Sequence, residues 1–283
     1  MGFTLKGGIA ADEPCSEKMS GQQERKEKQP FAVYSSTDDS LRFYSRERVP
    51  EPGEELEGRT ADAVYAREAF DGHRWDAYAD DVKTVEVVDE GIAPESTAYW
   101  FYRFNRMTSC DLSKLDTGNV VDMRWMFEGC VSLEELELSS FDVSRVDDME
   151  RMFAGCSSLK ELNLSSFDTG RVESMSGMFC GCSSLEYLDL TAFDTASACC
   201  FYAMFAGCSS LRDLDLSSFD TSSVDDMRRM FSGCGALRSL DLSSFDFREG
   251  VKLCAFAAFC EAAVEAMDGA DEEVKLEATG RSR

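Results

Sequence analysis

The stretch MFAGCSSLKELNLSSFDTG, which runs from Met152 to Gly170, decides the fold because the chain repeats it almost unchanged at a fixed interval. Related strings follow it as MFCGCSSLEYLDLTAFDTA, MFAGCSSLRDLDLSSFDTS and MFSGCGALRSLDLSSFDFR. The Met-Phe pair that opens them recurs every 26 residues, at Met126, Met152, Met178, Met204 and Met230. A fixed period of this length is typical of a stacked array, in which each copy buries its apolar face only against its neighbours.

Each copy predicts a strand, a corner, a short helix and a turn. Leu136 and Leu138 alternate with glutamates, which is the pattern of a strand with one buried face. Phe141 then fills the interior at the corner. The apolar residues that follow have the spacing of a helical stripe of about two turns; they are Val146, Met149, Met152, Phe153 and Cys156. We therefore expect an α/β stack with parallel strands on one side and short helical turns on the opposite side.

The pattern L-x-x-L-x-L followed by a corner residue resembles the leucine-rich repeat. More closely, the unit MFxGCSSLxxLDLSSFDTSxVxxM resembles the BspA-like family of bacterial-surface proteins with 26-residue leucine-rich repeats. The upstream stretches FAVYSSTDDSLRFYS and VKTVEVVDEGIAPESTAYWFY resemble the leading β-hairpin and the strand before the first repeat of that family. The resemblance covers about residues 31–260 and implies a leucine-rich-repeat solenoid. It also implies a cell-surface or secreted protein that takes part in adhesion or binding.

The array divides the chain into five expected segments. They are a polar, disordered lead at 1–30, a small β-rich N-terminal cap at 31–98, the leucine-rich-repeat solenoid at 99–250, a C-terminal capping helix at 251–269 and a charged tail at 270–283. The helix is predicted from the alanine-rich stretch VKLCAFAAFCEAAVEAMDG, because alanine favours helices and Gly269 provides a stop.

The formal net charge of −25 argues against nucleic acid and anionic lipid as partners, since both would be repelled. No run of about 18 apolar residues occurs, so no membrane insertion is expected. The first 30 residues lack the apolar core of a secretory signal, which keeps a cytoplasmic location open beside the surface or secreted location that the resemblance implies. No feature of the sequence indicates an oligomeric state.

Catalysis is not expected, and neither is a bound cofactor. His73 is the single histidine, so a nucleophile–histidine arrangement or a histidine metal cluster would depend on that residue alone. No glycine-rich loop of the kind that cradles phosphate occurs.

Two residue types recur at one point of every copy, and each has a structural explanation. The cysteines form a column of buried thiols that act as small apolar fillers, because parallel side chains in a column do not converge for disulfides or zinc; they are Cys130, Cys156, Cys182, Cys208 and Cys234. The aspartates accept hydrogen bonds from nearby backbone amides in a turn; they are Asp116, Asp142, Asp168, Asp194, Asp220 and Asp246. One copy replaces polar residues by Cys199 and Cys200, which we expect to be the most exposed thiols.

The exposed face of the predicted strands provides the candidate binding site. Two columns of side chains point outward from it: Glu135, Glu161, Tyr187, Asp213 and Ser239 in one, and Glu137, Asn163, Asp189, Asp215 and Asp241 in the other. Stacking places like charges about 5 Å apart, which is unfavourable without a counter-charge. The columns are either a solvated face or an acidic groove for a basic protein or peptide, with Tyr187 as an aromatic anchor. Calcium is an alternative ligand for the same carboxylates.

The sequence therefore predicts a non-catalytic recognition module that uses its acidic sheet face, of the bacterial surface or secreted adhesion type by resemblance. A cytoplasmic protein-interaction scaffold and a passive structural spacer are the alternatives.

Overall fold

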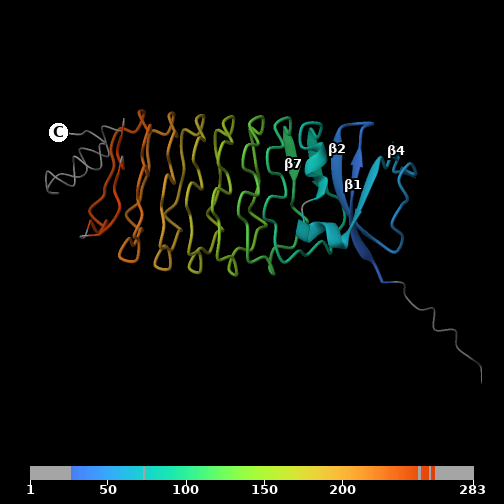
Figure 1. The fold of residues 1–283 in the computed structure, drawn as a ribbon, viewed down its shortest axis with the longest axis horizontal. Coiled ribbons are helices and arrows are strands. Elements are labelled where there is room, and N and C mark those ends of the chain that lie inside the picture. The colour runs from blue at the N-terminus through green and yellow to red at the C-terminus, as the bar shows by residue number, and fades with distance from the viewer. Residues whose placement is uncertain (1–26, 73, 248–249, 255, 259–283) are drawn as a thin grey trace, which may run out of the picture.

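The computed structural model describes residues 27–72, 74–247, 250–254 and 256–258. A small β-sheet at the N-terminal end leads into a long stack of similar coils, each of which spans one 26-residue repeat (Figure 1). The chain therefore advances along one axis, and segments one repeat apart lie side by side.

The N-terminal sheet has five strands in the order β5-β1-β2-β6-β7. These strands are β1 (Gln29–Ser35), β2 (Ser40–Arg46), β5 (Ala63–Ala66), β6 (Thr84–Val87) and β7 (Ser109–Asp111). β1 pairs antiparallel with β2 and β5, whereas β2, β6 and β7 run parallel. The remaining elements are the two-stranded sheet of β3 (Glu55–Leu56) and β4 (Arg59–Thr60), and the 3₁₀ helices η1 (Arg67–Gly72) and η2 (Arg74–Tyr78). β1 begins inside the segment expected as a polar lead.

Aromatic side chains join this sheet to the first coil. Phe43 of β2 stacks on Trp100 with ring centroids 5.2 Å apart, and Trp75 packs edge-on against both rings. The indole of Trp75 donates to the Trp100 carbonyl over 2.5 Å, and the indole of Trp100 donates to the Phe70 carbonyl over 3.2 Å. The sheet therefore closes the first coil with an apolar, hydrogen-bonded surface, as the end of a repeat array requires.

A column of parallel phenylalanine rings runs through the interior of the stack. Successive rings, from Phe127 to Phe231, are 5.7 to 5.8 Å apart and within 10° of parallel. Leu136, Leu138 and Phe141 are buried beside them, and so are their equivalents in the following repeats except the half-buried Leu240. Each coil thus shares its interior with its two neighbours.

The expected leucine-rich-repeat solenoid of parallel strands and short helical turns is wrong. No α-helix occurs among the described residues, whose only helical segments are the 3₁₀ helices η1 and η2. The segment expected as helical alternates between two kinds of backbone hydrogen bond. The Met126 amide donates three residues back, to Met123, whereas the Trp125 amide donates across to Glu150 of the next coil. Two residues with positive φ occur in each such segment, as at Arg151 and Gly155 with φ 55° and 73°, and this left-handed conformation breaks an α-helix.

The parallel ladder also lies on the other side of the coil from where the leucines predict it. Isolated parallel bridges connect successive coils through Ser96, Asp122, Asp148, Ser174, Cys200, Asp226 and Lys252. On the leucine side, the first coil pairs in parallel with β6 through β7 and through a bridge between Ile92 and Leu115. The later coils are linked there by sparser backbone bonds, such as Glu186 to Lys160 and Arg212 to Glu186 at 3.2 Å, and by a bridge between Tyr187 and Asp213. The only multi-stranded sheets of the described chain are the mixed sheet and the β3–β4 pair.

The start of the expected C-terminal helix is another coil. Lys252 forms a parallel bridge with Asp226, the Phe231 amide donates to the Phe256 carbonyl, and the Gly233 amide donates to Ala258. The described residues from 251 to 258 therefore repeat the turn segment of the preceding coils instead of forming a helix. The rest of that expected helix, the tail at 270–283 and residues 1–26 of the lead lie outside the described residues.

Candidate functional site

Each coil has two sides, which differ in what they expose. We call residues 108–116 and their equivalents up to 238–246 the leucine side, and the rest of each coil the turn side. The two outward columns of the leucine side become row 1, which contains Glu135, Glu161, Tyr187, Asp213 and Ser239, and row 2, which contains Glu137, Asn163, Asp189, Asp215 and Asp241. All ten side chains are exposed, and the leucines between the rows are mostly buried.

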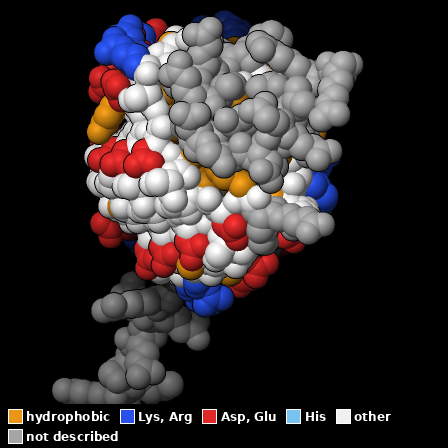
Figure 2. Space-filling model, turned by 90° about the vertical axis from the view of Figure 1, so that its left-hand side faces the viewer, with side chains coloured by type: hydrophobic (Ala, Val, Ile, Leu, Met, Phe, Trp, Pro, Cys, Tyr) orange, Lys and Arg blue, Asp and Glu red, His pale blue; other side chains and the backbone are white. Residues whose placement is uncertain are grey.

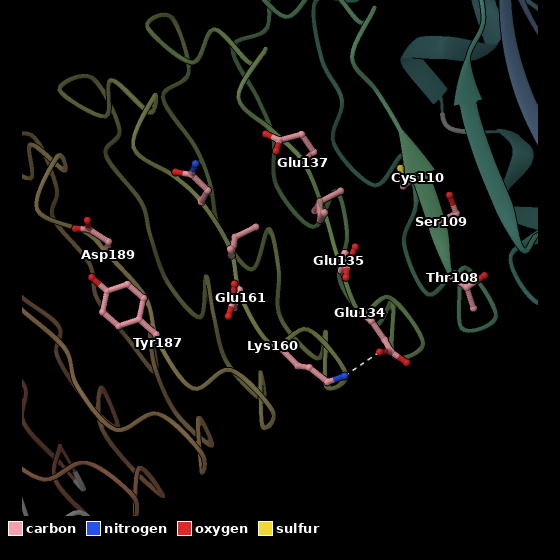
Figure 3. Close-up of a pocket in the computed structure, with 13 residues that line it drawn as sticks. Thr108, Ser109, Cys110, Glu134, Glu135, Glu137, Lys160, Glu161, Tyr187 and Asp189 are labelled. Atoms are coloured by element: carbon pink, nitrogen blue, oxygen red, sulfur yellow. Dashed lines mark hydrogen bonds and ion pairs between the residues drawn. The ribbon is translucent and has the colours of Figure 1, made fainter.

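An open groove of about 800 Å³ occupies the part of the leucine side next to the N-terminal sheet. Residues of rows 1 and 2 from three successive coils line it, and Ser109 and Cys110 of β7 lie at one end (Figure 3). At the other end, the Tyr187 ring and the Asp189 carboxylate project from one coil (Figure 3). Tyr187 is 59% exposed, more than any other large apolar or aromatic side chain of the described residues. The groove brings together six of the nine predicted binding residues, and Asp213, Asp215 and Asp241 lie beyond it.

Row 2 has a structural role that the sequence analysis missed. Each of its side chains accepts a hydrogen bond from the backbone amide two residues ahead, as in Ser139 to Glu137 at 2.7 Å and Thr191 to Asp189 at 3.0 Å. The amides of Ser165, Ser217 and Ser243 bond Asn163, Asp215 and Asp241 in the same way. The signal was present in the sequence, because Ser or Thr always stands two residues after row 2.

These turns also stabilise the negative charge of row 2. Hydrogen bonds from Ser139 lower the pKa of Glu137, and those from Thr191 lower the pKa of Asp189. Hydrogen bonds from Ser217 lower the pKa of Asp215, although the neighbouring carboxylates of Asp189 and Asp241 act in the opposite direction. Apart from the neutral Asn163, the row therefore consists of carboxylates that are held by the backbone and ionised at neutral pH, and those in adjacent coils repel one another.

A third row, one residue before row 1, carries three of the four basic residues of the leucine side. It contains Glu134, Lys160, Glu186, Arg212 and Arg238. Lys160 pairs with Glu134 at 2.9 Å, as Figure 3 shows, and Arg212 pairs with Glu186 at 3.0 Å. Both pairs are exposed and contribute little to stability. Of the basic residues of this face, Lys160 alone lines the groove, and it stands beside row 1.

Charge is divided unequally between the two sides of the stack. From residue 95 to 247, the leucine side carries 16 acidic and 4 basic residues, whereas the turn side carries 9 and 8. On the turn side, many carboxylates are paired, as in Glu128 with Arg151 at 2.7 Å and Asp226 with Arg228 at 2.5 Å. In the end-on view of Figure 2, acidic side chains gather along the lower margin of the exposed end. The leucine side is therefore the source of most of the negative potential of the stack.

The cysteine column lies in the interior, where each thiol has a backbone partner. Cys130, Cys156, Cys182, Cys208 and Cys234 are fully buried, and their Sγ atoms lie 3.0 to 3.2 Å from phenylalanine carbonyls of the preceding coil. Burial raises the pKa of the first four thiols well above the usual value. These are protonated thiols that satisfy carbonyl groups inside the stack.

The aspartate column at the corner also bonds to its own backbone. Asp116, Asp142, Asp168, Asp194 and Asp220 each accept from the amide two residues ahead, at 2.8 to 3.4 Å. The threonine that follows the aspartate adds a link that the sequence analysis missed. The Thr195 hydroxyl donates to the Asp220 carbonyl at 3.0 Å and accepts from the Asp220 amide at 2.8 Å, which joins two coils. Val143 and Phe247 occupy this position in two of the repeats and have no hydroxyl to offer.

The two exceptional thiols differ from each other. Cys199 is exposed and donates to the Glu173 carbonyl at 3.3 Å, whereas Cys200 is half-buried and accepts from the Ser176 hydroxyl at 2.9 Å. Burial and the neighbouring Cys200 raise the pKa of Cys199, which disfavours a reactive thiolate. Cys254, which the sequence analysis did not single out, is also exposed.

In the part of the chain that the structure describes, no three His, Cys, Asp or Glu side chains converge as a metal site. The carboxylates proposed for calcium instead lie in straight rows. His73 is outside the described residues. Within the described residues, no helix is both long enough and apolar enough to span a bilayer.

The fold and the rows define a stacked-coil repeat protein, and the comparisons place it in a family. The family described as "Mycoplasma protein of unknown function, DUF285" matches residues 95–210 and 159–264. Together these matches cover the 26-residue repeats and more than half of the chain, so the protein belongs to this family. No curated protein and no solved structure matches.

Proposed function

We propose that this protein is a non-catalytic recognition module whose leucine side binds a basic protein or peptide. The observation that supports this proposal is the groove, which combines ionised carboxylates from successive coils with the exposed ring of Tyr187. A partner with positive charge would be attracted from a distance and would relieve repulsion within the rows. An exposed tyrosine can then provide apolar contact area at small entropic cost.

Calorimetric titration with an oligolysine peptide tests the role of the leucine side. The variant Asp189→Asn/Asp215→Asn/Asp241→Asn removes three charges from row 2, and its amide oxygens can still accept the backbone bonds. The matched control, Glu95→Gln/Asp147→Asn/Glu173→Gln, removes three charges from exposed positions of the turn side. We expect the row 2 variant to lose about tenfold or more in affinity, and the control to lose much less. Equal losses, or no binding by the unmodified protein, would refute the proposal.

The finer resemblance to BspA-like surface repeats supports a place on the bacterial cell surface, with a role in adhesion to other cells or host molecules. Protease treatment of intact cells tests this location. A surface protein would be cleaved under conditions that leave a cytoplasmic marker intact. Protection of the repeat region until the cells are lysed would instead favour the intracellular scaffold.

A further inference from the structure

The groove contains an alternation of charge that constrains the ligand. Along row 2, the groove presents Glu137, then the neutral Asn163, then Asp189. Adjacent hydrogen-bonded chain segments are about 4.8 Å apart, so the two carboxylates are about 10 Å apart along the stack. Their side chains are oriented by bonds from the Ser139 and Thr191 amides. Two positive charges about 10 Å apart would therefore match the groove, with a neutral position between them.

The conformation of a peptide decides whether it can offer this spacing. A polyproline II segment has three residues per turn and rises about 3.1 Å per residue, so residues i and i+3 lie on one face about 9.3 Å apart. In a β-strand, residues on one face are about 6.8 Å apart. This distance matches neither the spacing of adjacent coils, about 4.8 Å, nor the spacing of about 10 Å between coils two apart. An α-helix has a diameter of about 10 Å or more, which exceeds the separation of about 7 Å between rows 1 and 2.

Tyr187 provides an observation that is independent of charge. Its ring is 59% exposed and stands in row 1 of the same coil as Asp189. Prolines of polyproline II ligands dock on exposed aromatic rings, and the preformed helix loses little entropy on binding. The ring thus offers an apolar contact beside a carboxylate, where a proline would follow a basic residue of the ligand.

We propose that the groove binds a polyproline II segment with a lysine or arginine at every third position, so that successive basic side chains meet Glu137 and Asp189 and an intervening proline packs on Tyr187. The proposal rests on the recognition function proposed above and specifies its ligand. A third basic residue would reach Asp241, two coils beyond Asp189, and would pass over Asp215.

Two peptides of equal composition, length and charge test whether basic residues must stand at every third position. Their binding to the full-length protein is measured by calorimetry. One contains three consecutive copies of Lys-Pro-Pro, and the other places three adjacent lysines between two runs of three prolines. We expect the regular peptide to bind about tenfold more tightly than the block peptide. The variants Asp189→Asn and Asp215→Asn form a matched pair, because each removes one charge from row 2 and retains its turn. Only Asp189→Asn should lower the affinity of the regular peptide to about that of the block peptide.

Tyr187→Ala should also weaken the regular peptide, and Asn163→Asp should reduce the difference between the two peptides because it fills the neutral position. Thermal unfolding of each variant checks that the stack is intact. Equal affinity of the two peptides, or equal losses of affinity in Asp189→Asn and Asp215→Asn, would refute the spacing of basic residues at every third position. Either result would leave charge-based recognition in place. Failure of both peptides and of oligolysine to bind would overturn the proposed function as well.

Discussion

The two sides of each coil differ in their structural role: the turn side holds the coils together, and the leucine side exposes charged residues. The turn side holds successive coils together, since its alternate amides donate across the stack and its bridges form an unbroken ladder from Ser96 to Lys252. The leucine side provides buried leucines and few backbone links, and it exposes rows of carboxylates that repel one another. Because the cohesion of the stack is concentrated on one side, the other side can carry unfavourable charge without loss of the fold.

The largest effect should come from removing an interior ring. Phe153→Ala deletes one member of the phenylalanine column and should cost about 3–5 kcal/mol, since both adjacent coils lose contacts. Tyr187→Ala removes a ring of similar size from the leucine side and should change stability by less than about 0.5 kcal/mol. Urea unfolding of both variants measures the two changes in the free energy of unfolding. Similar losses would show that the leucine side is not independent of the core.

The glycines of the turn side should come next. Gly181 has φ +76°, and a Cβ atom there would lie 3.6 Å from the Gly155 backbone. Gly181→Ala should therefore cost about 1–2 kcal/mol, the usual penalty for a left-handed residue other than glycine. Gly170 does not have a positive φ, and a Cβ atom there would meet only carboxylate groups of Asp194 and Asp168. If Gly170→Ala were as destabilising as Gly181→Ala in thermal melts, backbone conformation would not explain why glycine stands at position 181.

The threonine links between coils predict a pair of opposite effects. Thr195→Val removes two hydrogen bonds to the Asp220 backbone and should cost about 1 kcal/mol. Val143→Thr introduces a hydroxyl at an internal repeat that lacks it and should stabilise the stack by about 0.5–1 kcal/mol. Denaturant midpoints measure both changes. A destabilised Val143→Thr variant would mean that the new hydroxyl finds no partner in its coil.

The smallest predicted effect distinguishes the two sides by pH. The Asp189 pKa is lowered by its turn, so its stabilising contribution is present above about pH 4 and is lost as the pH falls through the folded-state pKa. Burial, together with the nearby Asp122 and Glu150, raises the pKa of Asp148 on the turn side, although Arg124 and the Glu150 amide oppose this. Ionised Asp148 therefore opposes folding at neutral pH, and this penalty disappears as the pH falls.

Asp189→Asn should thus reduce the loss of stability on acidification, whereas Asp148→Asn should stabilise at pH 7 and lose that advantage near pH 4. Urea unfolding at both pH values measures the two differences, and Asp147→Asn removes the same charge from an exposed neighbouring position as a control. Shifts of the same sign in the two variants would contradict the assignment of opposite roles.

The sequence predicted the period and the interior side chains but not the backbone that carries them. Apolar residues at Val146, Met149 and Met152 fit a helix, yet the same spacing also fits successive turns with bonds to the third residue back. The feature that excludes a helix is a left-handed residue at Trp125 or Arg151, and neither residue type signals that conformation. Periodicity indicates which side chains face inward, whereas the partners of the backbone amides depend on neighbouring coils.

The candidate site could be predicted in outline for a similar reason. The alternation around Leu136 placed rows 1 and 2 correctly on an exposed face, because burial of the leucines forces their neighbours outward. The turns of row 2 were missed, although Ser or Thr two residues after each member was visible. The limits of the groove could not be predicted, since they depend on where β7 meets the second coil.

Hydrogen exchange of backbone amides by NMR tests most directly whether the turn side holds the stack together. Amides that donate across coils, such as Phe127, Phe153 and Phe179, should be the most protected, because their exchange requires adjacent coils to separate. Amides on the leucine side of the groove, such as Glu135 and Glu161, should exchange far faster. Strong protection of Glu135 and Glu161 with rapid exchange at Phe127, Phe153 and Phe179 would contradict this division.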